Sequence, residues 1–127
     1  MEEKELIEAG NVLRSYRKST GLSVHKVGNR IGVSGGYIAK IERGENTPSD
    51  AVLVALAELY NKNEEELFRL YNKVESDEIK RFSKMHPAIR RTITAIFANK
   101  DFTENEALKA IERLEEISKD IIHGEDR

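Results

Sequence analysis

The chain of 127 residues is 39% hydrophobic and 35% charged with a formal net charge of −2, a composition that fits one domain or a small domain with an appendage and excludes wholesale disorder. The absence of cysteine excludes disulfides, thiolate metal sites and a cysteine nucleophile, and it fits a reducing cytosol. No apolar run approaches the length of a membrane span and the N-terminal sequence MEEKELIEAG is acidic, unlike a signal peptide, so we expect a cytoplasmic protein with no membrane partner.

Five short helices are predicted in the N-terminal part of the chain, because apolar residues recur every three or four positions and no segment alternates as a strand does. These helices are expected at 3–19, 24–31, 34–43, 50–60 and 63–71. Ser23, Ser34 and Ser49 are suitable N-caps, and Gly21 and Gly44 follow helix ends, as glycine commonly does. Together these signals predict a compact α-helical domain.

Three further helices are predicted beyond a polar junction at 72–77. The first, around Phe82, must end near Met85, because the residue before a proline avoids helical angles. Pro87 opens the second, PAIRRTITAIFANK, and the capping box TENE at 103–106 opens a long third helix. The chain is therefore expected to divide at the junction.

Charge is distributed unevenly along the chain. The segment 9–41 has no acid and six basic residues, which are Arg14, Arg17, Lys18, Lys26, Arg30 and Lys40. The segment 45–78, in contrast, has nine acids and three bases. A basic face within an acidic chain indicates phosphate binding, although an ordinary solvated face would have the same composition.

The second and third helices, joined by a tight turn at Gly32, form the helix-turn-helix pattern, in which the later helix is laid in the major groove of DNA. The segment VLRSYRKSTGLSVHKVGNRIGVSGGYIAKIERGENTPS resembles the phage-repressor-like (XRE) family of bacterial and phage regulators. The resemblance covers residues 9–70 and includes RKSTGLS, a small residue at Gly28, IGVS, YIAKIERG and Pro48. It implies an all-α fold, with a five-helix phage-repressor-like DNA-binding domain at 1–72 followed by a small C-terminal helical region at 73–127.

The same resemblance implies which residues face DNA. Base readers would come from the start of the third helix and from about one turn further on, and they are Ser34, Gly35, Gly36, Tyr37 and Lys40. Phosphate contacts would come from the start of the second helix and from the loop after the third, and they are Ser23, Val24, His25, Arg43, Asn46 and Thr47. The family also commonly pairs a base at the position of Arg17 with an acid at that of Glu42, so we expect a structural ion pair there.

Three residues depart from the family pattern. Val24 stands where glutamine is frequent, and valine cannot hydrogen-bond a phosphate. Gly35 and Gly36 stand where polar side chains are common, at the start of a helix that each glycine weakens by about 1 kcal/mol relative to alanine. They either let the backbone approach DNA closely or are neutral surface positions. In the first case reading falls to Ser34, Tyr37 and Lys40, since lysine can donate to guanine O6 and N7. In the second case the protein reads bases less directly and depends more on phosphates and DNA shape.

The long last helix has an apolar stripe with charged flanks, which suits pairing with another helix. We expect homodimerisation through Ile111, Leu114, Ile117 and Ile121, which would place one helix-turn-helix unit on each half-site of an inverted repeat. Two alternatives remain. The last three helices could fold back on the first domain, or they could dock a ligand, a peptide or an antirepressor.

No set of residues in the sequence indicates catalysis, a cofactor or a metal: His25, His86 and His123 are far apart, and no phosphate-loop lysine follows the glycine-rich segment 28–36. We therefore predict a transcriptional regulator that is not an enzyme, a dimeric repressor of bacterial or phage origin that places helix 34–43 in the major groove of a double-stranded DNA operator. The alternative is a partner-dependent interaction module, an antitoxin or a regulator controlled by an antirepressor or peptide, whose C-terminal helices bind another protein.

Overall fold

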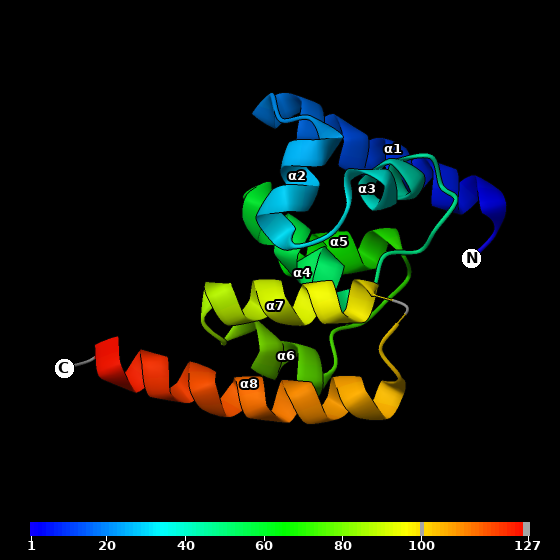
Figure 1. Cartoon of the computed structure of the whole chain (residues 1–127). Coiled ribbons are helices and arrows are strands. Elements are labelled where there is room, and N and C mark those ends of the chain that lie inside the picture. The colour runs from blue at the N-terminus through cyan, green and yellow to red at the C-terminus, as the bar shows by residue number, and fades with distance from the viewer. Residues whose placement is uncertain (100, 126–127) are drawn as a thin grey trace.

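The computed structural model describes residues 1–99 and 101–125 of the chain. These residues form eight helices and no strand, which confirms the predicted all-α class (Figure 1). In chain order the helices are α1 (Glu3–Thr20), α2 (Val24–Ile31), α3 (Gly35–Glu42), α4 (Asp50–Leu59), α5 (Glu64–Leu70), α6 (Asp77–Ser83), α7 (Pro87–Ala98) and α8 (Glu104–Glu125). Over the part of the chain described, none of them is both long and apolar enough to cross a bilayer.

Local capping explains where the first helices begin and end. The hydroxyls of Ser23, Ser34 and Ser49 accept hydrogen bonds from the backbone N–H three residues further on, at 3.2, 3.0 and 3.3 Å. Gly21 and Gly32 adopt left-handed φ angles of 74° and 88° and end α1 and α2. These signals are local, and the predicted boundaries of α1 to α5 accordingly lie within one residue of the observed ones.

The core is centred on α4, which contacts α2, α5, α6 and α7. Six of its ten residues are buried, and a helix that is apolar on most sides is expected in the middle of a fold. The largest side chains packed with it from the first five helices are at most 2% exposed, and they include Leu13, Val27, Ile38, Ile41, Leu67 and Phe68. This core fixes α2 and α3 relative to each other.

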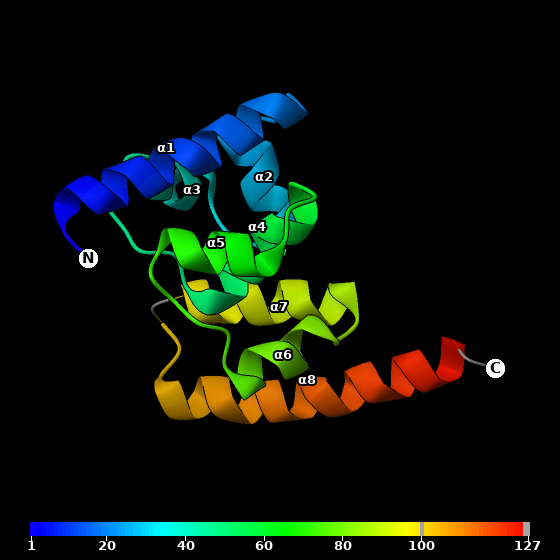
Figure 2. The same cartoon turned by 180° about the vertical axis from the view of Figure 1, so that it is seen from behind.

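The last three helices pack on the first five. α7 lies between the N-terminal helices and α8 in both views (Figures 1 and 2), and it contacts α4, α2 and α8. Phe82, Met85, Ile89 and Ile93 from α6 and α7 belong to the same buried cluster as the core of the first five helices. The fold-back arrangement is thus observed, while the division of the chain into domains 1–72 and 73–127 stays a prediction.

The apolar stripe of α8 is largely used within the chain. Ile111, Leu114 and Ile121 are half-buried and pack against the core, and between them the hydroxyl of Ser118 accepts a hydrogen bond of 2.8 Å from the backbone N–H of His86. Ile117, in contrast, is 46% exposed. Three of the four residues predicted to dimerise therefore have partners in their own chain, and dimerisation through the set stays a prediction.

Candidate nucleic-acid interface

The turn between α2 and α3 depends on two backbone hydrogen bonds to one carbonyl. The N–H groups of Gly32 and Val33 donate to the carbonyl oxygen of Gly28 at 2.8 and 2.9 Å. A Cβ at Gly28 would lie 2.5 Å from the carbonyl oxygen of Val33, so only glycine permits this close approach. The small residue noted in the sequence at this position therefore lets the turn pack directly on α2.

Gly35 and Gly36, at the start of α3, have different surroundings. Gly35 is buried, and a Cβ there would lie 2.3 Å from His25 Nδ1 and 3.0 Å from His25 Cα. The interpretation of Gly35 as a neutral surface position is therefore wrong, because Gly35 is buried and a side chain there would require the ring of His25 to move. Gly36 is exposed, and the atom nearest to a Cβ there would be Ser34 Oγ at 3.9 Å, so a side chain fits at this position.

The remaining predicted base readers lie at the exposed end of α3 or along it. Ser34 and Lys40 are exposed, whereas Tyr37 is half-buried and packs against the core. The Ser34 hydroxyl accepts from the N–H of Tyr37, which leaves its own proton free to be donated. Ser34, Gly36 and Lys40 thus form the accessible part of the predicted reading surface.

The predicted phosphate-contacting residues lie at two places. At the start of α2, Ser23 caps the helix and His25 is exposed, while Val24 is half-buried against the core and has no polar group in its side chain. In the loop after α3, Thr47 is exposed, Asn46 is half-buried, and Arg43 is exposed in an ion pair with Glu45, with Nη2 2.7 Å from Oε2. A phosphate would have to compete with Glu45 for this guanidinium. An exposed pair of this kind is worth little, so the competition is weak.

Arg17 and Glu42 form the expected ion pair, which joins α1 to the C-terminal end of α3. Arg17 Nε and Nη2 donate to the two carboxylate oxygens of Glu42 at 2.7 and 2.9 Å, and Arg17 Nη1 donates to the carbonyl of Leu22 at 3.0 Å. Glu42 is 2% exposed, and its hydrogen bonds raise the pKa of Arg17. Arg14, which the sequence did not single out for this role, adds a contact of 3.5 Å from its Nε. The buried carboxylate at the C-terminal end of α3 is therefore neutralised by α1.

Four basic residues on α1, α2 and α3 remain available to an anion. Lys18, Lys26, Arg30 and Lys40 are exposed, and none of them has an ion pair within residues 1–99 and 101–125. Because no carboxylate in this part of the chain holds these side chains, they can neutralise phosphates at little cost. In the same described residues, no group of three His, Asp or Glu side chains is placed to hold a metal ion.

Comparison with known proteins agrees with this geometry. A family model described as a helix-turn-helix domain matches residues 8–70, which span α2, the turn and α3. The chain is also 43% identical over 47 residues to the transcriptional regulator ClgR from two strains of Mycobacterium tuberculosis. That alignment covers 37% of this chain and 42% of each regulator. No solved structure gives a significant match. Residues 8–70 of the chain therefore form a helix-turn-helix domain.

Proposed function

We propose that the chain is a sequence-specific DNA-binding regulator of transcription, a homodimeric repressor that works in the cytoplasm of a bacterium or of a phage-infected cell and has no enzymatic activity. The observation that carries this proposal is the exposed start of α3, where Ser34 and Gly36 are accessible, together with the exposed Lys40 further along the same helix. A helix-turn-helix geometry presents that end to the major groove, and the exposed cations of α1 and α2 meet the phosphate backbone.

In this proposal the two parts of the surface have separate tasks. Lys40 and Ser34 donate to base edges, and Lys40 selects guanine through O6 and N7, with about 1–3 kcal/mol of discrimination for a good contact. Phosphates are held by the first N–H groups of α2 beside Ser23 and His25, and by Arg43 and Thr47 of the loop. The buried ion pair of Arg17 with Glu42 holds α3 in place.

Dimerisation follows from the size of this surface, because one helix-turn-helix unit covers a single half-site and specific binding commonly needs two. Ile117 is the member of the predicted set that is exposed on α8, and we propose that the two copies meet on this flank. Ile111, Leu114 and Ile121 would then support the interface from within each copy.

Selection of binding sites from random duplex DNA tests the proposal. At near-physiological salt, the purified chain is expected to enrich an inverted repeat with half-sites about one helical turn apart. Lys40→Ala should relax the base preference at one position, whereas Arg43→Ala should weaken binding to all sites alike. If the folded protein enriches no sequence, or if Lys40→Ala changes neither affinity nor preference, the assignment of the reading surface is refuted.

A second candidate is the partner-dependent module, in which the C-terminal helices bind another protein and DNA binding is secondary. Three large apolar side chains near the connection of α7 to α8 favour it, since Phe97, Phe102 and Leu108 are 51%, 42% and 50% exposed. This candidate predicts a monomeric chain that gains DNA affinity only when a partner is added. Sedimentation of the purified chain, with and without operator DNA, distinguishes it from the homodimer.

A further inference from the structure

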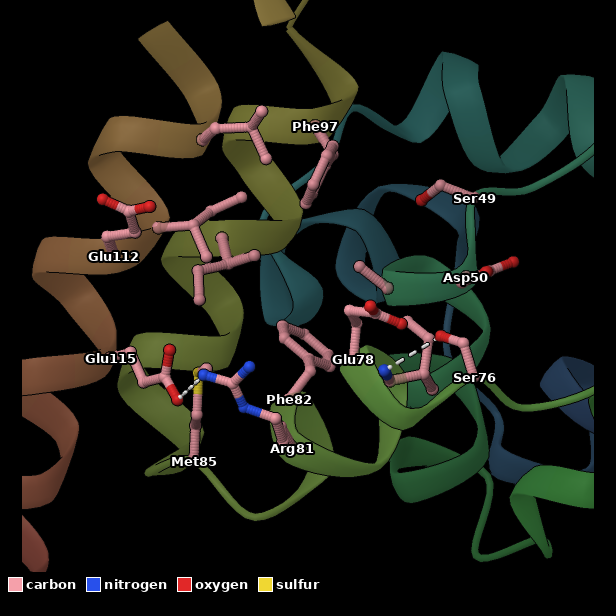
Figure 3. Close-up of a pocket in the computed structure, with 15 residues that line it drawn as sticks. Ser49, Asp50, Ser76, Glu78, Arg81, Phe82, Met85, Phe97, Glu112 and Glu115 are labelled. Carbon is pink, nitrogen blue, oxygen red and sulfur yellow. Dashed lines mark hydrogen bonds and ion pairs between the residues drawn. The ribbon is translucent and has the colours of Figure 1, made fainter. Parts of the chain in front are cut away.

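A cavity of about 510 Å³ lies where the N-terminal helices meet the last three (Figure 3). Its walls come from the start of α4, from α6, from α7 and from α8. The apolar part of the wall consists mainly of Phe82, Met85, Ile93, Phe97, Leu108 and Ile111. A cavity of this size and lining suits a small organic molecule.

The charged groups at the rim of this cavity are mostly acidic. Glu112 and Glu115 lie on the α8 side in Figure 3, and Asp50 and Glu78 lie across from them. Among the lining residues that the structure describes, Arg81 is the single cation, and it is already paired with Glu115.

Two of these carboxylates have no ion pair among the described residues. Asp50 is paired with Lys73 at 2.8 Å. Glu78 and Glu112 are exposed and form no direct ion pair in residues 1–99 and 101–125, although Glu78 also interacts electrostatically with Arg81. An apolar wall with an excess of negative charge at its mouth is complementary to a molecule that has an apolar body and a positive charge.

We propose that this cavity binds a small hydrophobic organic cation, and that its occupation weakens the binding of DNA by α3. The first half of the proposal stands on the cavity alone. The second half rests on the proposed function as a DNA-binding regulator.

The coupling to DNA binding runs through α7, which has the cavity on one face and the helix-turn-helix turn on the other. Ile93 and Phe97 line the cavity. On the opposite face, a Cβ at Gly32 would lie 2.7 Å from the carbonyl oxygen of Arg91 and 3.4 Å from the Cβ of Ala95. The turn therefore rests on the backbone of α7 with no spare space, and a ligand that pushes α7 must move the turn and with it α3.

A second route starts from the opposite wall of the cavity. Ser49, which lines it, is the N-cap of α4, and Asp50 is the first residue of that helix. Both closely follow the loop 43–47 that is proposed to hold phosphates. A ligand in the cavity would thus contact α7, which packs against the turn before α3, and also the start of α4, which follows the loop 43–47.

Tetraphenylphosphonium and tetraphenylborate are a suitable pair of probes, because they have nearly the same shape and opposite charge. Isothermal titration of the full chain is expected to show one saturable site for tetraphenylphosphonium and at least about tenfold weaker binding of tetraphenylborate. Equal affinity for the two ions, or no binding of the cation, overturns the proposal.

Two pairs of variants locate the site, and circular dichroism checks that each is folded. Glu112→Gln should weaken binding of tetraphenylphosphonium by about two- to fivefold, while Glu116→Gln, an exposed acid of α8 outside the cavity, should not. Phe97→Ala should weaken it by about fivefold, while Phe102→Ala, an exposed aromatic outside the lining, should leave it unchanged. If each control has the same effect as its partner, binding is elsewhere and the proposal fails.

The effect on DNA is measured separately, so that the two halves can fail separately. Saturating tetraphenylphosphonium is expected to lower operator affinity by about fivefold or more, and saturating operator must lower the affinity for the cation by the same factor. If the cation binds but operator affinity is unchanged, the coupling is refuted. If Phe97→Ala instead dissociates a dimer in sedimentation, the face is an interface between two copies, and the cavity is not a ligand site.

Discussion

Alanine substitutions at the two glycines that begin α3, Gly35 and Gly36, are predicted to change the free energy of unfolding in opposite directions. Gly35→Ala adds a Cβ within 2.3 Å of His25 Nδ1, 2.9 Å of His25 Cγ and 3.0 Å of His25 Cα, so neighbouring groups must shift. Overpacking of this kind costs about 1–3 kcal/mol, and the better helix propensity of alanine returns at most about 1 kcal/mol. We expect a net loss of about 1–2 kcal/mol in the free energy of unfolding.

Gly36→Ala is the matched control. Its added Cβ would meet only Ser34 Oγ at 3.9 Å, so the gain in helix propensity is not offset and the free energy of unfolding should rise by about 0.5–1 kcal/mol. The two variants are therefore expected to differ by about 2 kcal/mol. Urea denaturation followed by circular dichroism at 25 °C resolves such a difference through the midpoint, at constant m-value.

A double variant identifies the source of the clash. His25→Ala removes the two ring atoms that lie nearest to the new Cβ and leaves the backbone of residue 25 in place, so Gly35→Ala should be less destabilising by about 1 kcal/mol in that background. The steric account of α2 against α3 is refuted if Gly35→Ala is as stable as Gly36→Ala, or if the His25→Ala background leaves its effect unchanged.

Three further predictions concern other parts of the fold. Glu42→Ala should destabilise the chain by about 1–3 kcal/mol, because it leaves the half-buried Arg17 guanidinium without its carboxylate partner. Glu45→Ala, at an exposed ion pair, should change stability by less than about 1 kcal/mol, and urea denaturation of both variants measures the difference. Burial raises the pKa of Tyr71, so the folded state holds this proton more tightly than the unfolded state. Stability should then fall as the pH rises above about 10, by up to about 1.4 kcal/mol per pH unit from this group, and Tyr71→Phe should remove that part of the slope in denaturation series at about pH 9–11. Ile117→Asp should raise the dissociation constant of the dimer by about tenfold or more in sedimentation, and an unchanged dimer would place the interface elsewhere.

The helices were predictable because their signals are local. Ser23, Ser34 and Ser49 cap the next turn through a hydroxyl three residues away, and Gly21 and Gly32 end helices through their own φ angles. None of these interactions depends on what the helix packs against, so the sequence around each residue is sufficient to place it.

The burial of Gly35 could not be predicted in the same way. It results from the angle at which α2 crosses α3, which brings His25 against the first residue of α3. The spacing of residues along the chain does not determine the angle at which α2 crosses α3. An exposed glycine such as Gly36 and a buried one therefore look alike in the sequence.

The sequence also could not indicate what the apolar stripe of α8 packs against. An apolar stripe such as Ile111, Leu114 and Ile121 has the same pattern whether it covers α7 or a second copy of itself, because both partners need the same spacing. The placement of α7 against Gly32 was also not indicated, since Arg91 and Ala95 belong to the less apolar face of a helix far from the turn in sequence.

The open space above Gly36 has a consequence for how this protein can change. Most residues of α3 are tied down, Gly35 by α2, Ile38 and Ile41 by the core, and Glu42 by Arg17. Gly36 is exposed in the middle of the proposed reading surface, and the nearest neighbour of a Cβ added there would be Ser34 Oγ at 3.9 Å. An asparagine, glutamine or arginine fits there without disturbing the fold, and each brings donors or acceptors that match a base pair. A single amino-acid substitution at Gly36 could therefore change which base pairs the proposed reading surface prefers, with the fold unchanged.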